Sequence, residues 1–301
     1  MESALIMSYF NLRSSNKIIL PLLGLLLVFF VACKKKTSDQ EPVYEVNQAY
    51  NLQNISYGND NQQKMDIYLP ANRSSATTKV FVLIHGGGWS AGDKSDYTYM
   101  MNSLKTYYPN HAIINLNYRL ASQTSPAYPK QINDIRDALT EISLAKYNVS
   151  EQFFLFGNSA GGHLSLLYAY GFDFNHRVKG ICNTVGPADF TDPNYLNNPS
   201  FSYYYPVLVG QSNPIPMSLI REVSPACRVT PTAPPTLSFY GELDPLVPAT
   251  QMGRLHDSLN AHGVYNESTM YQGAGHGNWN QTQSQDCITK MALFINTYFP
   301  Q

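Results

Sequence analysis

The pentapeptide Gly157-Asn158-Ser159-Ala160-Gly161 places a serine where its hydroxyl group can react. It follows the apolar run FFLF at 153–156 and precedes a stretch typical of a helix, so a strand, a sharp turn and a helix are expected here. In that setting the pattern G-x-S-x-G presents the serine oxygen at the helix N-terminus, and a chance pentapeptide in a loop is the alternative. The pattern therefore predicts Ser159 as a nucleophile.

A serine nucleophile needs a base to take its proton and a carboxylate to orient that base. His276 is the candidate base, because it lies between two glycines in a loop that follows the strand-like stretch STMY. Asp244 is the candidate carboxylate, just past the strand-like stretch LSFY, and Glu242 is its rival. Serine, aspartate and histidine follow one another in the order that accompanies a G-x-S-x-G turn. His163, one helical turn after Ser159, is expected to face the helix packing.

A glycine-rich loop upstream offers a second element of the same chemistry. His85-Gly86-Gly87-Gly88-Trp89 ends the apolar run VFVLI, and its glycines let backbone N–H groups turn toward a developing oxyanion. We expect the N–H groups of Gly86 and Gly87, together with that of Ala160, to form an oxyanion hole. A phosphate-binding loop is the competing interpretation, but the sequence has no following Lys-Ser/Thr pair and no G-x-G-x-x-G pattern.

The elements that must position these residues alternate between strands and helices from about Tyr44 onward. Apolar runs such as VFVLI are typical of strands buried on both faces, and alternation with helices predicts an α/β fold with a mostly parallel sheet and helices on both faces. The expected strands cover 65–69, 80–84, 112–116, 153–156, 178–185, 236–240 and 267–271. The expected helices cover 131–145 and 159–170, with two more near 252–259 and 288–299.

The stretch from Pro187 to about Thr232 breaks this alternation. It is rich in Pro, Asn, Ser and Tyr and has no clear period. An irregular insertion of this length in a compact domain is usually functional. We predict a small irregular cap over the active site within a domain that covers 45–301, and a plain surface loop is the alternative.

The N-terminal segment has the features of a targeting signal. Arg13 and Lys17 precede an apolar run at 18–32 that is short for a membrane-spanning helix and contains proline and glycine. Its end, Phe30-Val31-Ala32-Cys33, resembles a bacterial lipobox, which implies a signal peptide at 1–33 and lipidation of Cys33. A polar tether at 34–44 would follow, and the protein would be exported and anchored in the periplasm or on the outer surface. An ordinary cleaved signal peptide and an uncleaved anchor are the alternatives.

Composition restricts the partners of this chain. With 301 residues and a net charge of −1, the sequence gives no indication of nucleic-acid binding. No cluster of cysteine and histidine has the spacing of metal ligands, so we expect neither a metal nor a cofactor. Apart from Cys33, three cysteines remain, namely Cys182, Cys227 and Cys287. At most one pair of them can form a disulfide, and three buried free thiols are the alternative.

Taken together, these motifs resemble the α/β-hydrolase superfamily, on the branch of hormone-sensitive-lipase-like esterases and bacterial acetyl-xylan and feruloyl esterase-like proteins. The matching segments are MDIYLP at 65–70, HGGGW at 85–89, NYRL at 117–120, GNSAGGHL at 157–164, SPA at 224–226, GELDPLVP at 241–248 and GAGHG at 273–277. The resemblance implies an α/β-hydrolase fold and a serine esterase. Trp89 and Tyr118 are the candidate substrate contacts, and we expect Trp89 either to pack beneath the glycine-rich loop or to line the acyl pocket. The sequence has Asn158 before the nucleophile, where lipase relatives usually carry aspartate.

The motifs thus predict a serine carboxylic-ester hydrolase that forms an acyl-enzyme with a small-molecule or carbohydrate ester. Polar and tyrosine residues in the expected cap favour short acyl groups over long hydrocarbon chains. An amidase or arylformamidase with the same three residues is one alternative. A catalytically inactive glycan-binding surface lipoprotein is the other, and it gives no reason for the serine, the aspartate, the histidine and the glycine loop to occur together.

Overall fold

The computed structural model describes residues 42–199, 201, 204–211 and 214–300. The predicted signal peptide, Cys33 and most of the predicted tether lie outside this range. No helix in the described part of the chain is both long and apolar enough to span a membrane.

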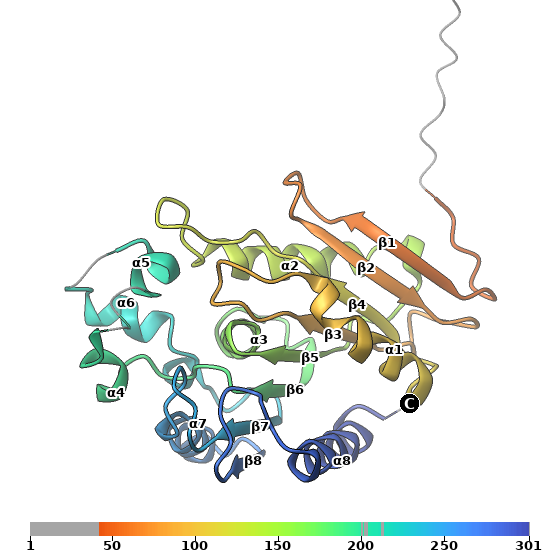
Figure 1. Ribbon diagram of the computed structural model, residues 1–301. Coiled ribbons are helices and arrows are strands. Elements are labelled where there is room, and N and C mark those ends of the chain that lie inside the picture. Colours follow the sequence, from red (N-terminus) through yellow and green to blue (C-terminus); the bar gives the residue numbers. More distant parts are fainter. Residues whose placement is uncertain (1–41, 200, 202–203, 212–213, 301) are drawn as a thin grey trace, which may run out of the picture. The chain divides into compact units, whose positions relative to one another are not determined.

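An eight-stranded sheet forms the centre of the domain, with the strand order β1-β2-β4-β3-β5-β6-β7-β8 (Figure 1). Strand β2 pairs antiparallel with β1 and β4, and the other neighbours pair in parallel. This is the α/β-hydrolase fold, with the mostly parallel sheet that the sequence predicted. The strands are β1 Tyr50–Ser56, β2 Lys64–Leu69, β3 Val80–Ile84, β4 Ala112–Leu116, β5 Phe153–Asn158, β6 Val178–Thr184, β7 Thr236–Gly241 and β8 Asn266–Tyr271.

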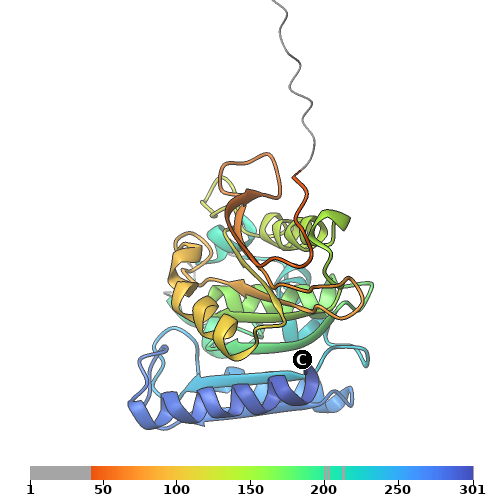
Figure 2. The same cartoon turned by 90° about the vertical axis from the view of Figure 1, so that its right-hand side faces the viewer.

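Helices cover both faces of the sheet. Successive strand residues point to opposite faces, so Val80 and Val82 pack into one core while Phe81 and Leu83 pack into the other. Helices α2, α3 and α7 cover the first face, and α1 and α8 cover the second; Figure 2 shows α8 and α2 on opposite sides. Their bounds are α1 Thr98–Tyr107, α2 Lys130–Ile142, α3 Ala160–Gly171, α7 Thr250–Ala261 and α8 Gln281–Tyr298. Two short 3₁₀ helices, η1 Lys94–Tyr97 and η2 Ala145–Tyr147, lie in the connections.

From β3 the chain adds β4 on one side, whereas β5 and the strands after it are added on the other side of β3. A change of this kind leaves room for a binding site. The chain leaves β3 toward α1 on one face of the sheet and leaves β5 toward α3 on the other. The loops after these two neighbouring strands therefore diverge and leave a crevice at the carboxyl ends, where ligands bind in open α/β sheets. The glycine-rich loop follows β3, and Ser159 follows β5.

The expected cap is not irregular throughout, because its described residues include several short helical segments. These are α4 Pro193–Leu196, α5 Tyr204–Val209, α6 Met217–Glu222 and η4 Pro225–Arg228. Helices of four to six residues are too short to show a helical period, and prolines begin two of them. Figure 1 shows α4, α5 and α6 gathered beyond the carboxyl ends of β5 and β6.

The three cysteines of the described residues form no disulfide with one another. Cys182 and Cys287 are buried thiols, and Cys227 is an exposed one. Burial raises the pKa of Cys287 to about 12, which keeps this thiol protonated and unreactive at neutral pH.

Candidate active site

Ser159, His276 and Asp244 form one hydrogen-bonded chain. The Ser159 Oγ lies 2.8 Å from His276 Nε2, and His276 Nδ1 lies 2.6 Å from Asp244 Oδ2. The three residues come from the β5–α3 turn, the β8–α8 loop and the loop after β7, at the same end of the sheet. This is the geometry in which a histidine takes a proton from a serine while a carboxylate fixes its tautomer.

The Asp244 carboxylate is oriented by the backbone as well as by the histidine. Its Oδ1 accepts hydrogen bonds from the N–H groups of Leu246 at 2.8 Å and Val247 at 2.9 Å, which leaves Oδ2 for His276. The rival carboxylate, Glu242, instead accepts a hydrogen bond from the Gly273 N–H at 2.9 Å. Geometry therefore selects Asp244 as the partner of the histidine.

Ser159 has the strained backbone of a sharp strand-to-helix turn. Its φ of 50° lies in the left-handed region, which is uncommon for any residue other than glycine. Neighbouring glycines make the turn possible, because a Cβ at Gly157 would collide with the Gly161 carbonyl and one at Gly161 with the Ile84 carbonyl. The sequence GNSAG thus folds as a turn that holds the serine hydroxyl at the start of α3.

The glycine-rich loop lies against this turn. A Cβ at Gly86 would stand 3.0 Å from the backbone oxygen of Asn158, the residue before Ser159. Gly87 has a φ of 111°, and its carbonyl accepts hydrogen bonds from Ser90 and Ala91, which closes the loop. The structure therefore places the expected oxyanion donors of the loop next to the serine turn.

The two candidate substrate contacts, Trp89 and Tyr118, are buried, so Trp89 takes the first of its two expected placements and the prediction for Tyr118 is wrong. Their side chains are 3% and 1% exposed, respectively. The Tyr118 hydroxyl donates a hydrogen bond to the His85 carbonyl at 2.8 Å, and its ring stacks on the His85 imidazole with centroids 4.3 Å apart. Both aromatic side chains therefore support the loop from below and do not offer a surface to a substrate.

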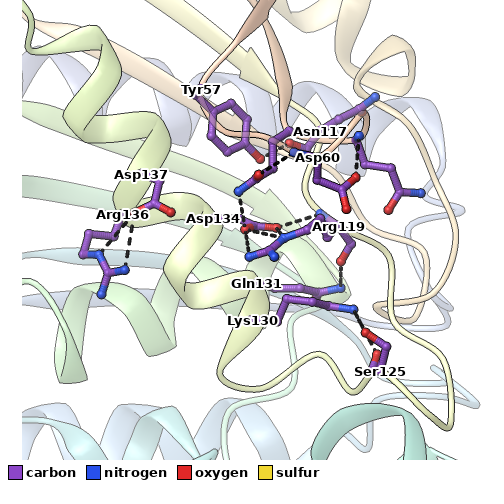
Figure 3. A network of polar contacts seen from close by, with 12 residues as sticks. Tyr57, Asp60, Asn117, Arg119, Ser125, Lys130, Gln131, Asp134, Arg136 and Asp137 are labelled. Carbon is purple, nitrogen blue, oxygen red and sulfur yellow. Dashed lines mark hydrogen bonds and ion pairs between the residues drawn. The ribbon is translucent and has the colours of Figure 1, made fainter.

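An ion pair between the partly exposed Arg119 and the buried Asp134 anchors the segment that carries Tyr118 (Figure 3). Asp134 on α2 accepts hydrogen bonds from the Arg119 guanidinium, the Arg119 N–H and Gln63 Nε2. Together these bonds satisfy a carboxylate that would be costly to bury alone, and the bond from the guanidinium to Asp134 raises the pKa of Arg119. The neighbouring carboxylate on this helix, Asp137, pairs instead with Arg136 at the surface.

Gln131 connects this ion-pair network to the glycine-rich loop. Its Nε2 donates hydrogen bonds to the Trp89 carbonyl at 2.7 Å and to the Arg119 carbonyl at 2.9 Å. Sequence reasoning missed this role, because Gln131 lies on the apolar face of a helix and 42 positions separate it from Trp89. The loop is thus fixed from α2 as well as from the strand that precedes it.

A hollow of about 250 Å³ borders the serine turn on the α1 and α8 side. Its apolar lining comes mainly from Met100, Phe156 and Met291, and polar groups of Tyr97 and Asn158 lie at its edge. The full lining is Asp96, Tyr97, Met100, Phe156, Gly157, Asn158, Cys182, Thr184 and Met291. A second hollow of about 420 Å³ lies at the C-terminal end of α3, far along that helix from Ser159.

Within the described residues, no group of three or more His, Cys, Asp or Glu side chains is arranged to hold a metal ion. The arrangement of a serine hydroxyl, an imidazole base, an oriented carboxylate and a turn of N–H groups suits acyl transfer.

Comparison with known proteins places the chain among α/β-hydrolases. The profile of the family described as BD-FAE matches residues 65–259, a range that includes Ser159 and Asp244. "Esterase LipC" of Mycobacterium tuberculosis is 26% identical over 243 residues, which cover 74% of this chain and 59% of that protein. "Arylacetamide deacetylase" of Oryctolagus cuniculus is 30% identical over 154 residues, which cover 47% of this chain and 38% of that protein. The chain thus spans about half the length of these curated relatives.

A solved structure has the same fold. "Truncated form of carbohydrate esterase from gut microbiota" superposes with a TM-score of 0.65 at 20% sequence identity, covering 83% of this chain and 98% of that one. At this identity the likeness establishes the arrangement of strands and helices.

Proposed function

The chain belongs to the BD-FAE family, and from this premise we propose that it is a serine carboxylic-ester hydrolase that acts through an acyl-enzyme on short acyl esters, including acyl groups on carbohydrates. The hydrogen-bonded chain from Ser159 through His276 to Asp244 carries this proposal. The names of the esterase relative and of the carbohydrate esterase structure agree with it.

In the proposed first step, His276 Nε2 takes the proton of Ser159 while the serine oxygen attacks the ester carbonyl carbon. The N–H groups of Gly86, Gly87 and Ala160 stabilise the negative charge on the carbonyl oxygen. When the tetrahedral intermediate collapses, the ester C–O bond breaks and the alkoxide leaves with the proton from His276. The acyl group is then bonded to Ser159.

The second step repeats the chemistry with water as the nucleophile. His276 accepts a proton from the water, the resulting oxygen attacks the acyl carbon, and Ser159 recovers its proton as the acid leaves. The Asp244 carboxylate accepts the Nδ1 hydrogen throughout, so the Nε2 lone pair of the neutral imidazole faces the serine.

The size of the acyl group is the first test of this function. We expect kcat/KM to be highest for acetyl to butyryl esters and to fall for chains beyond about eight carbons. A longer acyl chain gains about 0.8 kcal/mol of binding free energy per methylene only where an apolar surface of the protein can bury it. Two of the cap tyrosines, Tyr195 and Tyr205, do not offer such a surface, because they are buried against Phe201. Ser200, Ser202 and Tyr203, which the sequence also assigned to the cap, lie outside the described residues.

A series of p-nitrophenyl esters from acetate to palmitate measures this preference, with Ser159→Ala as the background control. A maximum of kcat/KM at decanoate or longer would contradict the proposal and favour a lipase. Acetylated xylan and N-formylkynurenine in the same experiment separate a carbohydrate esterase from a formamidase.

For the N-terminus we propose a lipid anchor on Cys33, which would tether the enzyme outside the bacterial cytoplasm. The lipobox-like end of the apolar run supports this proposal. Two or more acyl chains give stable membrane attachment, whereas a single chain does not. We expect Cys33→Ser to move the protein from the membrane fraction to the soluble fraction with unchanged specific activity. Cell fractionation measures this, and a variant that stays with the membranes would indicate an uncleaved anchor.

A further inference from the structure

His163 connects the glycine-rich loop to the cap through the two nitrogens of its ring. The side chain lies on α3, one turn after Ser159, and is fully buried. Its Nδ1 lies 3.1 Å from the Trp89 indole nitrogen, and its Nε2 lies 2.8 Å from the Val223 carbonyl oxygen. An indole N–H only donates, so Nδ1 must accept and Nε2 must carry the hydrogen that Val223 accepts. Both neighbours together fix one neutral tautomer.

The residue held by the first of these bonds has a strained backbone. Trp89 has a φ of 63°, in the left-handed region that a bulky side chain rarely adopts. Its carbonyl accepts hydrogen bonds from the Ala121 N–H at 2.8 Å and from Gln131 Nε2 at 2.7 Å. Its indole ring meets the His163 imidazole edge to face, with centroids 5.4 Å apart. Contacts from three separate segments therefore maintain a conformation that the residue would not keep by itself.

The conformation of Trp89 bears directly on the loop that precedes it. Gly86 and Gly87 lie three and two positions before Trp89, respectively. The directions of their N–H groups therefore depend on the few backbone dihedral angles that separate them from the fixed tryptophan. The second bond of His163 reaches Val223, which ends α6 in the cap. One side chain thus links the start of α3, the loop and the cap.

We propose that His163 is a positioning residue, which holds Trp89 so that the N–H groups of Gly86 and Gly87 point at the oxyanion. This inference rests on the proposed function, because an oxyanion forms only if Ser159 attacks a carbonyl. The hydrogen bonds to the oxyanion strengthen in the transition state, so their misalignment lowers kcat more than it changes KM.

Three substitutions separate the two hydrogen bonds. The Asn oxygen in His163→Asn can replace Nδ1 and keep the bond to Trp89, whereas the Gln nitrogen in His163→Gln can replace Nε2 and keep the bond to Val223. His163→Leu removes both. We expect His163→Leu and His163→Gln to lower kcat by roughly 10- to 100-fold with KM within about twofold of the wild type, because a small misplacement of catalytic groups has this effect. His163→Asn should stay within about fivefold of the wild-type kcat.

His111→Leu is the matched control for replacing a buried histidine. His111 is 2% exposed and packs against Phe81 and Phe299 on the opposite face of the sheet, so its loss should leave kcat unchanged. The spectroscopic readout uses the fact that the chain has two tryptophans. A ¹⁵N-indole spectrum gives one signal for each, and Trp279→Phe assigns them. The Trp89 signal should keep its position in His163→Asn and shift in His163→Gln and His163→Leu.

A kcat within twofold of the wild type in His163→Leu would overturn the proposal, as would equal losses in His163→Leu and His111→Leu. A normal kcat in His163→Gln together with a low one in His163→Asn would also overturn it, since the cap contact alone would then matter. If His163→Leu does not fold, the Asn and Gln variants still decide. The indole signals report the Trp89 contact whether or not the wild type hydrolyses esters, so failure of the proposed function remains distinguishable.

Discussion

Replacing Ser159 with alanine is expected to lower kcat for ester hydrolysis by about 10⁶-fold and to leave the midpoint of thermal unfolding unchanged. The hydroxyl is the group that His276 faces at 2.8 Å, and alanine leaves the base without a nucleophile to activate. Serine and alanine pay a similar conformational free energy to adopt the φ of 50° that the turn requires, so the substitution adds no backbone strain. Turnover of p-nitrophenyl acetate and a thermal unfolding curve measure the two quantities.

Ser165→Ala is the matched control on the same helix. The Ser165 hydroxyl is buried and donates a hydrogen bond to the Gly161 carbonyl at 2.8 Å, about 1.7 helical turns beyond the nucleophile. Its removal should change kcat by less than about threefold, as the loss of one neutral hydrogen bond away from the reacting atoms predicts. Retention of a tenth of the wild-type kcat in Ser159→Ala would rule out this serine as the nucleophile.

Asp244→Asn should lower kcat by about 10⁴-fold, the second largest effect that the structure predicts. The N–H groups of Leu246 and Val247 bind one oxygen of the carboxylate, so the asparagine carbonyl will occupy that position. Its NH₂ group must then face His276 Nδ1, which becomes an acceptor. The histidine hydrogen moves to Nε2, and the base can no longer accept the proton of Ser159.

Glu242→Gln tests the rival carboxylate in the same protein. Glutamine keeps an oxygen that can accept the Gly273 N–H, so kcat should fall by less than about tenfold. Steady-state kinetics on both variants decide between the two carboxylates. A larger loss in Glu242→Gln than in Asp244→Asn would show that the carboxylate assignment is wrong.

The sequence predicted the sheet and the three residues of the hydrogen-bonded chain because their signals are local. Apolar runs such as VFVLI mark strands buried on both faces, and Ser159, Asp244 and His276 follow strands directly. Loops at the carboxyl ends of parallel strands meet at one edge, so chain order and strand position together were enough to bring these residues into one site.

Strand β1, helix α1 and the cap helices were missed, since their formation depends on neighbours distant in sequence. The residues of β1 are partly exposed, and the strand exists because it pairs with β2. Helix α1 buries two residues, Met101 and Leu104, which is too few for a clear apolar period. The cap helices are shorter than the window in which a period can be recognised.

The direction of side chains at the site was the least predictable feature. Tyr118 was expected to contact substrate, and for Trp89 the sequence left open whether it packs beneath the loop or lines the acyl pocket, because an aromatic residue beside such a loop can face inward or outward. Their partners lie far away in sequence: His163 is 74 positions from Trp89, and the His85 carbonyl is 33 positions from Tyr118. Such contacts follow from the packing of whole elements, which no local pattern specifies.

Covalent labelling at the active site tests the central claim most directly, because an acyl-enzyme requires that one serine react. The protein is treated with phenylmethylsulfonyl fluoride until hydrolysis stops, and its mass and peptide fragments are then measured. We predict a single adduct on Ser159, formed in proportion to the loss of activity and absent from Ser159→Ala. Complete inhibition with the adduct on another serine, or continued hydrolysis by a protein fully labelled at Ser159, would contradict the account.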